Sequence, residues 1–443
     1  MLIKTLKAFI YINYHSMSCH HKCNCHDKKH VHKCEYEEEE EEYEEEECHE
    51  CHCHHHQPRK IEHLIVVEEP REYTYLPDSS TAIFSDHTDS VNCVAISPVF
   101  SSNGSIIFAT GGSDNLVYLH YYKNPTEFTH IKLEGHKSKV SVVSFSSDGS
   151  LLASGGSDGR VRIWDSFNGS FISKLIGPPK DTQIIWFSWH PSPKLPAVVA
   201  GDGAGSMWMW NARTGKCVKV YCGHVGPVIA GGFKPDATEM WSVGDDASLH
   251  VWTPKTGEIT ITVRDNVTDL DRDGHKIDFH RRPITCGSIS PNGTLFITGD
   301  EAGIVKLVRS DYGKVLGQLD AGVRKIMDVQ FSSDSQMIAV ASRNCSASVW
   351  SHMEGDRYKM RHALIHPGPV LLIRWHPKKP YIITACEDGA VRLFDARNGE
   401  KLHEFGGHTS LITGIAVKLL QNNTLMIITS SQDKTARIFD FKE

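Results

Sequence analysis

Short runs in which apolar and polar residues alternate fill most of the chain after its first 80 residues, and turn-forming residues separate these runs. In Val140–Phe145 the alternation has a period of two; Ser147-Asp148-Gly149 follows, and Leu151–Ser154 begins the next run. Short runs with turn residues at intervals of roughly 8–12 residues are typical of β-strands. The pattern therefore predicts an all-β fold.

These runs form a long repeat. The clearest copy starts at Leu151 and ends in Trp164-Asp165, after the turn Ser157-Asp158-Gly159. The residues at the position of this tryptophan are His120, Trp164, Trp210, Trp252, Val308, Trp350, Phe394 and Phe439. Successive positions lie 42 to 46 residues apart, except for one gap of 56. A period of this length with such an ending is typical of four-stranded propeller blades, so the sequence predicts an eight-bladed β-propeller.

The ring must also close. The sequence stops at Glu443, directly after the third strand of the eighth repeat, and Ser80–Ser85 precedes the first repeat. We expect residues 80–85 to supply the missing outer strand, because this leaves no open sheet edge between the chain ends. The predicted organisation is thus a tail at 1–60, a linker at 61–79 and a propeller at 80–443.

The gap of 56 residues contains a polar insertion at about residues 265–282. It is predicted to be a surface loop. Departures from the period often lie on the binding face of a repeat protein, but loops also lengthen at little cost. Both interpretations remain open.

The acidic excess and a cluster of cysteines both lie within the first 60 residues. Residues 1–60 carry 13 acidic and 8 basic side chains, whereas the remainder carries 41 and 39. The propeller is therefore not a basic, nucleic-acid-binding body, and we expect no direct nucleic-acid partner. The tail combines two Cys/His clusters with a Glu run at 37–47 and little apolar content, a composition that predicts disorder.

The tail cysteines are candidate metal ligands, since thiolate and imidazole together suit zinc or copper(I). Their spacing is too tight for a defined zinc finger. Opportunistic metal binding and a functionless low-complexity expansion both remain open. The candidates are Cys19, Cys23, Cys25, Cys34, Cys48, Cys51 and Cys53.

The other six cysteines are scattered singly through the repeats, as expected of free thiols in a reducing compartment. Residues 1–14 are too weakly apolar for a secretory signal, and Met17 is an alternative start. No stretch reaches the roughly 20 apolar residues of a membrane span. We expect a cytoplasmic or nuclear, monomeric protein without a cofactor.

Several repeats share a His before the first strand, a Ser or Thr on the second, an Asp in the next turn and an aromatic residue on the third. Because this set recurs, it indicates buried polar side chains that satisfy one another, rather than a catalytic triad. The network residues are His136, Ser154, Asp158 and Trp164; His224, Ser242, Asp246 and Trp252; and His408, Thr429 and Asp433. Gly203-Ala204-Gly205, Ala302 and Asn344 break the pattern, which predicts more mobile third, fifth and sixth blades. With no phosphate-binding loop or nucleophile elbow in view, we expect no enzymatic activity.

Residues 86–441 resemble the WD-repeat propellers. Within them, these residues resemble the subfamily of angio-associated migratory cell protein and its fungal ribosome-assembly counterpart. The likeness rests on Trp189-His190-Pro191 with Trp208-Met209-Trp210, on Leu307-Val308 with Gly313-Lys314-Val315, and on Val391–Arg397. The resemblance implies a non-enzymatic scaffold, and a chaperone or assembly factor for a basic ribosomal protein in large-subunit biogenesis. A basic client favours an acidic surface, supplied either by one face of the ring or by the Glu run.

A second hypothesis concerns Phe394-Asp395-Ala396-Arg397, which resembles the Trp-Asp-x-Arg motif of substrate receptors in cullin-type ubiquitin ligases. The alternative is that Arg397 is only a turn residue after a third strand. The motif is short, so both readings stay open.

Binding residues are expected in the loops before each first strand and between second and third strands, because a rigid scaffold usually carries function in its loops. The candidates for partner binding are Asp86, Asp89, Lys137, Lys139, Arg281, Arg282, Arg324, Lys325, Arg397 and Ser410.

Overall fold

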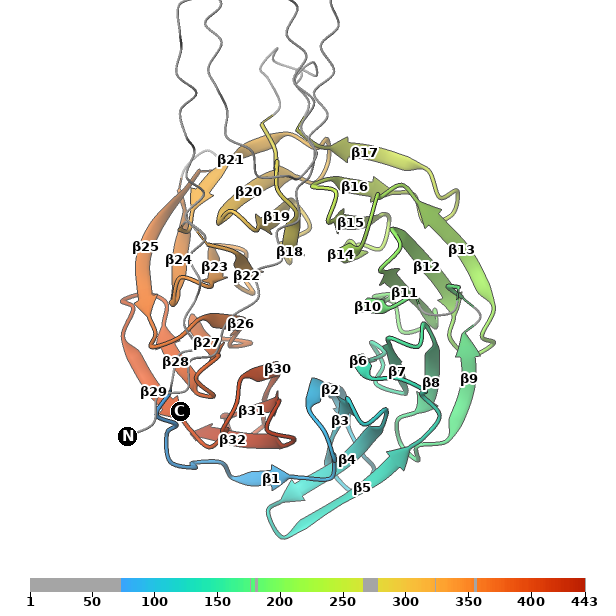
Figure 1. Cartoon of the computed structure of the whole chain (residues 1–443), viewed down its shortest axis with the longest axis vertical. Helices are drawn as coiled ribbons and strands as arrows, with labels where there is room; N and C mark the ends of the chain where they lie inside the picture. Colours follow the sequence, from blue (N-terminus) through green and yellow to red (C-terminus); the bar gives the residue numbers. More distant parts are fainter. Residues whose placement is uncertain are drawn as a thin grey trace, which may run out of the picture. The chain divides into compact units, whose positions relative to one another are not determined.

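The structure is a computed structural model that describes residues 73–442, apart from 176, 180, 181, 266–277, 323 and 354–356. In this part of the chain every regular element is a β-strand, and the 32 strands form eight four-stranded antiparallel sheets. The same residues contain no helix with the length and apolar character needed to cross a membrane. The first strands of successive sheets contact one another in cyclic order, which makes the sheets the blades of a closed ring (Figure 1). The predicted eight-bladed propeller is confirmed.

The first four blades are each formed by four consecutive strands. They are β2 (Val91–Phe100), β3 (Ile106–Gly112), β4 (Val117–Asn124) and β5 (Glu127–Leu133); β6 (Val140–Phe145), β7 (Leu151–Gly156), β8 (Val161–Asp165) and β9 (Phe171–Leu175); β10 (Ile184–Trp189), β11 (Ala197–Asp202), β12 (Ser206–Asn211) and β13 (Cys217–Cys222); and β14 (Val228–Phe233), β15 (Met240–Gly244), β16 (Leu249–Trp252) and β17 (Ile259–Val263).

The last four blades follow the same order until the chain ends. They are β18 (Ile284–Ile289), β19 (Leu295–Asp300), β20 (Ile304–Arg309) and β21 (Val315–Asp320); β22 (Ile326–Phe331), β23 (Met337–Ser342), β24 (Ser346–Met353) and β25 (Arg357–Ile365); β26 (Val370–Trp375), β27 (Tyr381–Cys386), β28 (Val391–Asp395) and β29 (Lys401–Phe405); and β30 (Ile412–Leu419), β31 (Thr424–Ser431) and β32 (Ala436–Lys442) with β1 (Ala82–Phe84).

The eighth blade joins the two ends of the described chain. Strand β1, which lies within the segment expected to close the ring, pairs antiparallel with β32, and Ala82 lies opposite Ile438. Just before β1, the carboxylate of Asp78 accepts a hydrogen bond from the guanidinium of Arg437 in β32. The outermost strand of this blade is therefore held only by noncovalent contacts.

The core lies between the blades. Eight buried apolar clusters are found among the described residues, and each draws its side chains from two neighbouring blades. Because the core lies between blades, the second strand of a blade is covered on both faces by its neighbours. In the second blade, all six residues of the second strand, β7, are buried. The outer strand β9 instead alternates between exposed and buried residues.

The irregular repeats keep the common register. His120 lies opposite Phe108 and Val308 lies opposite Phe296, as Trp164 lies opposite Leu152 in the regular second blade. Most of the insertion falls on residues 266–277, outside the described residues. At its edges, Arg281 Nε donates to Asp265 Oδ2 over 2.7 Å.

Candidate binding face

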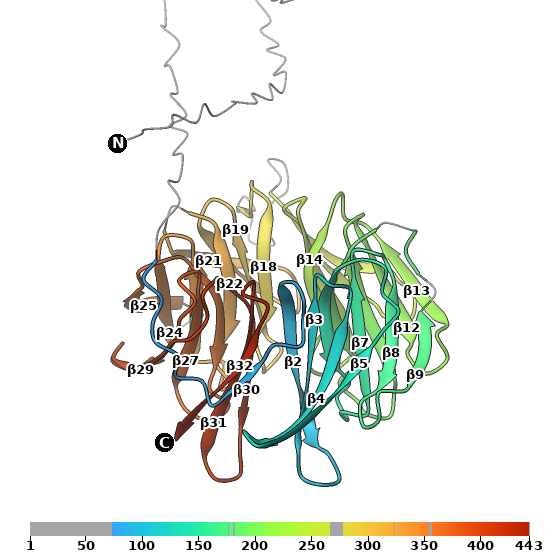
Figure 2. The same ribbon diagram turned by 60° about the horizontal axis from the view of Figure 1, so that its bottom comes forward.

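The antiparallel strands distribute the loops between the two ends of the ring. The segments before each first strand and the turns between second and third strands lie at one end, here called the front face. The remaining turns lie at the opposite end, the back face; Figure 2 shows the ring tilted, with loops at both ends. The geometry places nine of the ten predicted partner-binding residues on the front face. Arg397, which follows the third strand β28, lies on the back face.

One backbone hydrogen bond is repeated in every blade, and we call the residues that form it the rim of the front face. In the first blade, the amide of Ser113 donates to the carbonyl of Ser90 over 2.8 Å. In the other seven blades the donor and acceptor residues are Ser157 and Lys139, Gly203 and Gln183, Asp245 and Pro227, Glu301 and Pro283, Arg343 and Lys325, Glu387 and Pro369, and Gln432 and Leu411. The side chains of these residues therefore occupy equivalent places in the eight blades.

The predicted polar network has its expected geometry in the second blade. Trp164 Nε1 donates to Ser154 Oγ over 2.9 Å, and Ser154 Oγ lies 2.8 Å from His136 Nε2. The Ser hydroxyl can then donate to Nε2, which leaves the proton on Nδ1 facing Asp158 Oδ2 at 3.2 Å. Each polar group is satisfied, so the network fixes the turn against two strands.

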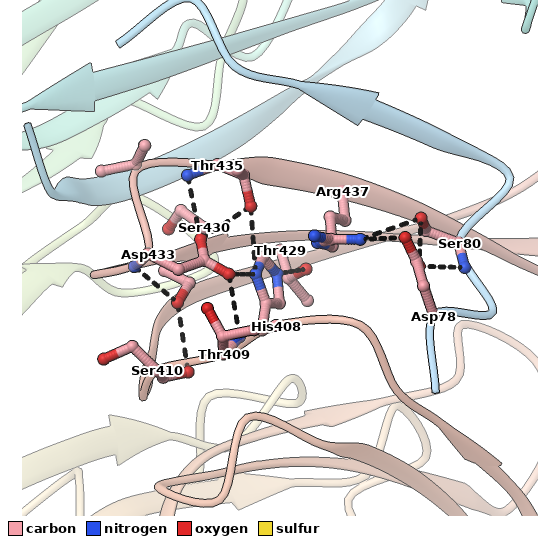
Figure 3. A network of polar contacts seen from close by, with 12 residues as sticks. Asp78, Ser80, His408, Thr409, Ser410, Thr429, Ser430, Asp433, Thr435 and Arg437 are labelled. Atoms are coloured by element: carbon pink, nitrogen blue, oxygen red, sulfur yellow. Dashed lines mark hydrogen bonds and ion pairs between the residues drawn. The ribbon is translucent and has the colours of Figure 1, made fainter. Parts of the chain in front are cut away.

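The fourth and eighth blades repeat this geometry. His224 lies 3.0 Å from Asp246 and 2.8 Å from Ser242. In the eighth blade, His408 lies 2.8 Å from both Asp433 and Thr429. Figure 3 shows His408 between these two side chains. There Phe439 replaces the tryptophan and donates nothing to the network.

The network also stabilises the charge of its carboxylates. Burial raises the pKa of Asp433, but the hydrogen bond and charge of His408, with bonds from Thr435 and the amide of Thr409, lower it well below its usual range. Asp246 in the fourth blade behaves in the same way. These carboxylates are therefore permanent acceptors at neutral pH. The Ser and Thr hydroxyls beside the histidines are fully buried, so they are closed to a substrate.

Two further blades contain a network that the sequence pattern missed. In the first, His87 bonds Thr110 and Asp114; in the seventh, His366 lies 2.9 Å from Thr384. In the second, fourth and seventh blades, the histidine and the residue that carries the hydroxyl are 18 positions apart in the sequence. This constant spacing could have identified His366 and Thr384 from the sequence.

The prediction of a broken network in the fifth blade was wrong. Ala302 occupies the expected Asp position, but Asp300, the last residue of β19, reaches His280 Nδ1 at 2.8 Å. His280 also bonds Thr298 over 2.8 Å. The acceptor has moved by two residues, and the carboxylate still reaches the ring nitrogen.

Among the described residues of the third and sixth blades, no histidine links the turn to the second strand. Asp202 accepts from Trp208 Nε1, while Asn344 bonds only its own turn and the preceding loop. We therefore expect slow amide exchange in β15 and β19 and faster exchange in β11 and β23, measured by hydrogen–deuterium exchange in the native state. Equal protection of β11 and β15 would contradict this expectation.

The predicted partner residues do not form one patch. They lie on the first, second, fifth, sixth, seventh and eighth blades. Several are engaged locally: Asp89 Oδ1 accepts from the Ser90 amide, and Lys325 Nζ lies 3.6 Å from Glu301. On the second blade, Lys137 lines a mostly basic pocket of about 350 Å³ with Arg160, Arg162 and Lys174. The front face thus carries both signs of charge.

Three rim carboxylates were not among the predicted residues. Asp245, Glu301 and Glu387 occupy the same position in the fourth, fifth and seventh blades, directly after the second strand. Glu301 and Glu387 face Lys325 and Arg343 of the sixth blade at 3.6 and 4.0 Å. Asp245 is exposed, and among the described residues it forms no ion pair. The first turn residue after each second strand was the signal that could have identified them.

Arg397 has a local structural explanation. Its Nε lies 3.0 Å from Asp395 Oδ1 and its second terminal nitrogen lies 2.6 Å from Oδ2, while the side chain is 63% exposed. This bidentate pair closes the turn after β28. The predicted metal ligands Cys19 to Cys53 all lie outside the described residues.

Comparison with known proteins places the fold in a family. The WD domain, G-beta repeat, matches residues 78–120, 127–165, 272–308 and 313–351, and the WD40 domain of anaphase-promoting complex subunit 4 matches 340–421. An uncharacterized WD repeat-containing protein of Schizosaccharomyces pombe is 31% identical over 369 residues, which cover 82% of this chain and 87% of that protein. Human angio-associated migratory cell protein is 25% identical over 378 residues, 82% of this chain and 80% of the human protein.

Solved structures agree with this assignment of the fold. Sqt1 of Saccharomyces cerevisiae superposes with a TM-score of 0.72 at 19% identity, covering 83% of this chain and all of Sqt1. Chaetomium thermophilum Sqt1 bound to the N-terminus of the ribosomal protein L10 gives a TM-score of 0.70 at 23% identity, covering 82% of this chain and all of that one. With its eight blades, its repeated polar networks and these relatives, the chain belongs to the WD40-repeat family.

Proposed function

We propose that this protein is a non-enzymatic, protein-binding scaffold that acts as a chaperone or assembly factor for a basic ribosomal protein in large-subunit biogenesis. The observation that carries the proposal is the set of rim carboxylates on the front face: Asp245, which forms no ion pair among the described residues, and Glu301 and Glu387, whose basic neighbours lie 3.6 and 4.0 Å away and can be replaced by a client's cations. They present acceptors to the lysine and arginine side chains of an extended segment laid across the front face.

The relatives support this choice of client. Chaetomium thermophilum Sqt1, whose fold covers 82% of this chain, has been solved with the N-terminus of the ribosomal protein L10 bound to it. The six cysteines of the described chain are all free thiols, and burial raises the pKa of the Cys93 thiol to about 12. Free thiols suit the cytoplasm or the nucleus, where ribosome assembly takes place.

The distribution of charge on the front face determines how a basic client would bind. Because the front face carries both signs, its carboxylates act as separate contact points, and a general acidic field would have to come from the Glu run at 37–47. A client would thus be attracted at long range by the tail and held at short range by the rim.

Reversing the charge of Asp245 tests the proposal. We expect Asp245→Lys to weaken binding of a peptide with the N-terminal sequence of the same organism's L10 by about tenfold, because a like charge then faces the client. Isothermal titration calorimetry with the full chain measures the loss. Glu258→Lys is the control, since it makes the same charge change in the same blade but on the exposed back face. A wild-type protein that does not bind the peptide, or equal losses in both variants, would refute the proposal.

A further inference from the structure

Three potential metal ligands meet where the closing segment enters the first blade. Asp86 lies in the loop between β1 and β2, while His120 in β4 and His130 in β5 are directly opposite each other in the sheet. Asp86 Oδ1 lies 3.3 Å from His130 Nδ1, and Asp86 Oδ2 lies 4.0 Å from His120 Nδ1. One ligand atom from each residue lies within 4.8 Å of the other two.

His120 is buried with one nitrogen unsatisfied. It occupies the position of the blade tryptophan, it is 1% exposed, and its ring stacks on Phe108 at a centroid distance of 4.4 Å and meets the edge of Phe84 at 5.1 Å. Among the described residues, its Nδ1 has no hydrogen-bond partner. A buried polar atom without a partner is costly and calls for an explanation such as a bound ion.

The neighbouring network determines which nitrogen of His120 carries its proton. Asp114 accepts from His87 Nδ1, so His87 Nε2 must accept the hydroxyl proton of Thr110, 2.9 Å away. Thr110 Oγ1 can then only accept from His120 Nε2, at 3.1 Å. This leaves a lone pair on His120 Nδ1, on the side of Asp86 and His130.

This arrangement matches that of metal-binding histidines, whose second nitrogen is usually held by a hydrogen bond that fixes the tautomer. The His120 ring is almost fully buried, at 1% exposure. The aromatic rings of Phe84 and Phe108 surround it with an apolar shell.

We propose that Asp86, His120 and His130 bind a divalent transition metal ion, most suitably Zn²⁺, with water in the fourth position. Zinc accepts two imidazoles and a carboxylate at about 2.0–2.2 Å, which requires ligand atoms about 3.3 Å apart. Asp86 lies in a loop and His130 is partly exposed, with side-chain exposures of 24% and 38%, so small rotations bring both ligands to that separation. The ion would tie the segment that follows β1 to the outer strands of the first blade and so secure the closure of the ring.

A second cluster of the same residue types serves as a contrast. His224, Asp246 and His250 also bring three ligand atoms within 4.8 Å of one another. There, both nitrogens of each ring are already bonded: His224 to Asp246 and Ser242, and His250 to Ser248 and Thr262. A metal would have to break these bonds, so we assign no site there.

Metal-dependent stability tests the proposal in the full chain. We expect Zn²⁺ to raise the thermal unfolding midpoint of the wild type by on the order of a few degrees, because an ion that binds only the folded state stabilises it. Asp86→Asn and His130→Gln should reduce the apparent Zn²⁺ affinity at least tenfold and abolish the shift at low Zn²⁺. Both positions are partly exposed, so both variants should fold; calorimetry without metal checks this.

Two controls separate this site from other metal binding. His250→Gln removes the second cluster and should leave the Zn²⁺ shift intact. The tail cysteines are present in every variant, and Co²⁺ absorption distinguishes them, since thiolate ligands produce charge-transfer bands that a His₂Asp site lacks. No shift in the wild type, or an equal shift in wild type, Asp86→Asn and His130→Gln, would overturn the proposal.

Discussion

Replacing Phe84 by alanine should lower the free energy of unfolding by about 3–5 kcal/mol, the usual loss for a buried phenylalanine. Phe84 in β1 is 3% exposed and packs edge-to-face on Phe108 and Phe128 at centroid distances of 5.0 and 5.3 Å. Because β1 is only three residues long, this single side chain provides most of the apolar contact that holds the closing strand. Urea unfolding followed by tryptophan fluorescence measures the loss.

The neighbouring residue provides the control. Ile83 is 45% exposed and points away from the core, so Ile83→Ala should change stability by less than about 1 kcal/mol. In Phe84→Ala the amides of β32 should also exchange faster, since β1 is their outer partner. If both alanine variants lost the same stability, the closing role of β1 would be contradicted.

Mild acid should destabilise the ring well before its carboxylates are protonated. Burial, followed by the electrostatic effect of the neighbouring His224, lowers the pKa of His250 to about 4; burial, followed by the charge of Arg392, does the same for His366. Below pH ~6.5 the unfolded state binds protons at these residues that the folded state does not, so stability falls from about pH 6.5 to about pH 4. Each histidine can contribute up to about 3 kcal/mol of this loss.

The buried carboxylates affect the stability of the ring in a separate, lower pH range. The pKa of Asp158, Asp246 and Asp433 is depressed, so their contribution is present above pH ~4 and is lost only as the pH falls further. Urea unfolding at several pH values between about 7 and 4.5 isolates the histidine effect. His366→Gln should flatten the profile, whereas His403→Gln, at an exposed site, should not. A wild-type midpoint that stays constant over this range would contradict the prediction.

The sequence period predicted the fold well because each blade repeats the same contacts with its neighbours. Eight endings, including the weak ones at His120 and Val308, predicted eight sheets, and the unfinished last repeat pointed to the segment that contains β1. Such information is local: it needs only the spacing between strands and the residues of the turns.

The site residues were harder to predict because their roles depend on how far each side chain extends and on contacts between residues that are distant in the sequence. The position of Ala302 suggested a missing carboxylate, yet Asp300 fills the role from the end of a strand. The partner residues were chosen by loop position, which identified the face but not the rim carboxylates such as Asp245. Asp86 was predicted to bind a partner, and nothing in the spacing linked it to His120 and His130, since these three side chains meet only when the strands of the first blade pair.

The way the last blade is completed has a consequence for the synthesis of the protein. Asp78 and Arg437, which meet across β1 and β32, are 359 residues apart in the chain. At a ribosomal rate of about 5–20 residues per second, the first-made strand waits roughly 20–70 seconds for its partner. Throughout that time the nascent chain exposes unpaired strand edges at both ends of the growing array, a hazard for aggregation. The newborn protein should therefore depend on protection at the ribosome until its final strand has emerged.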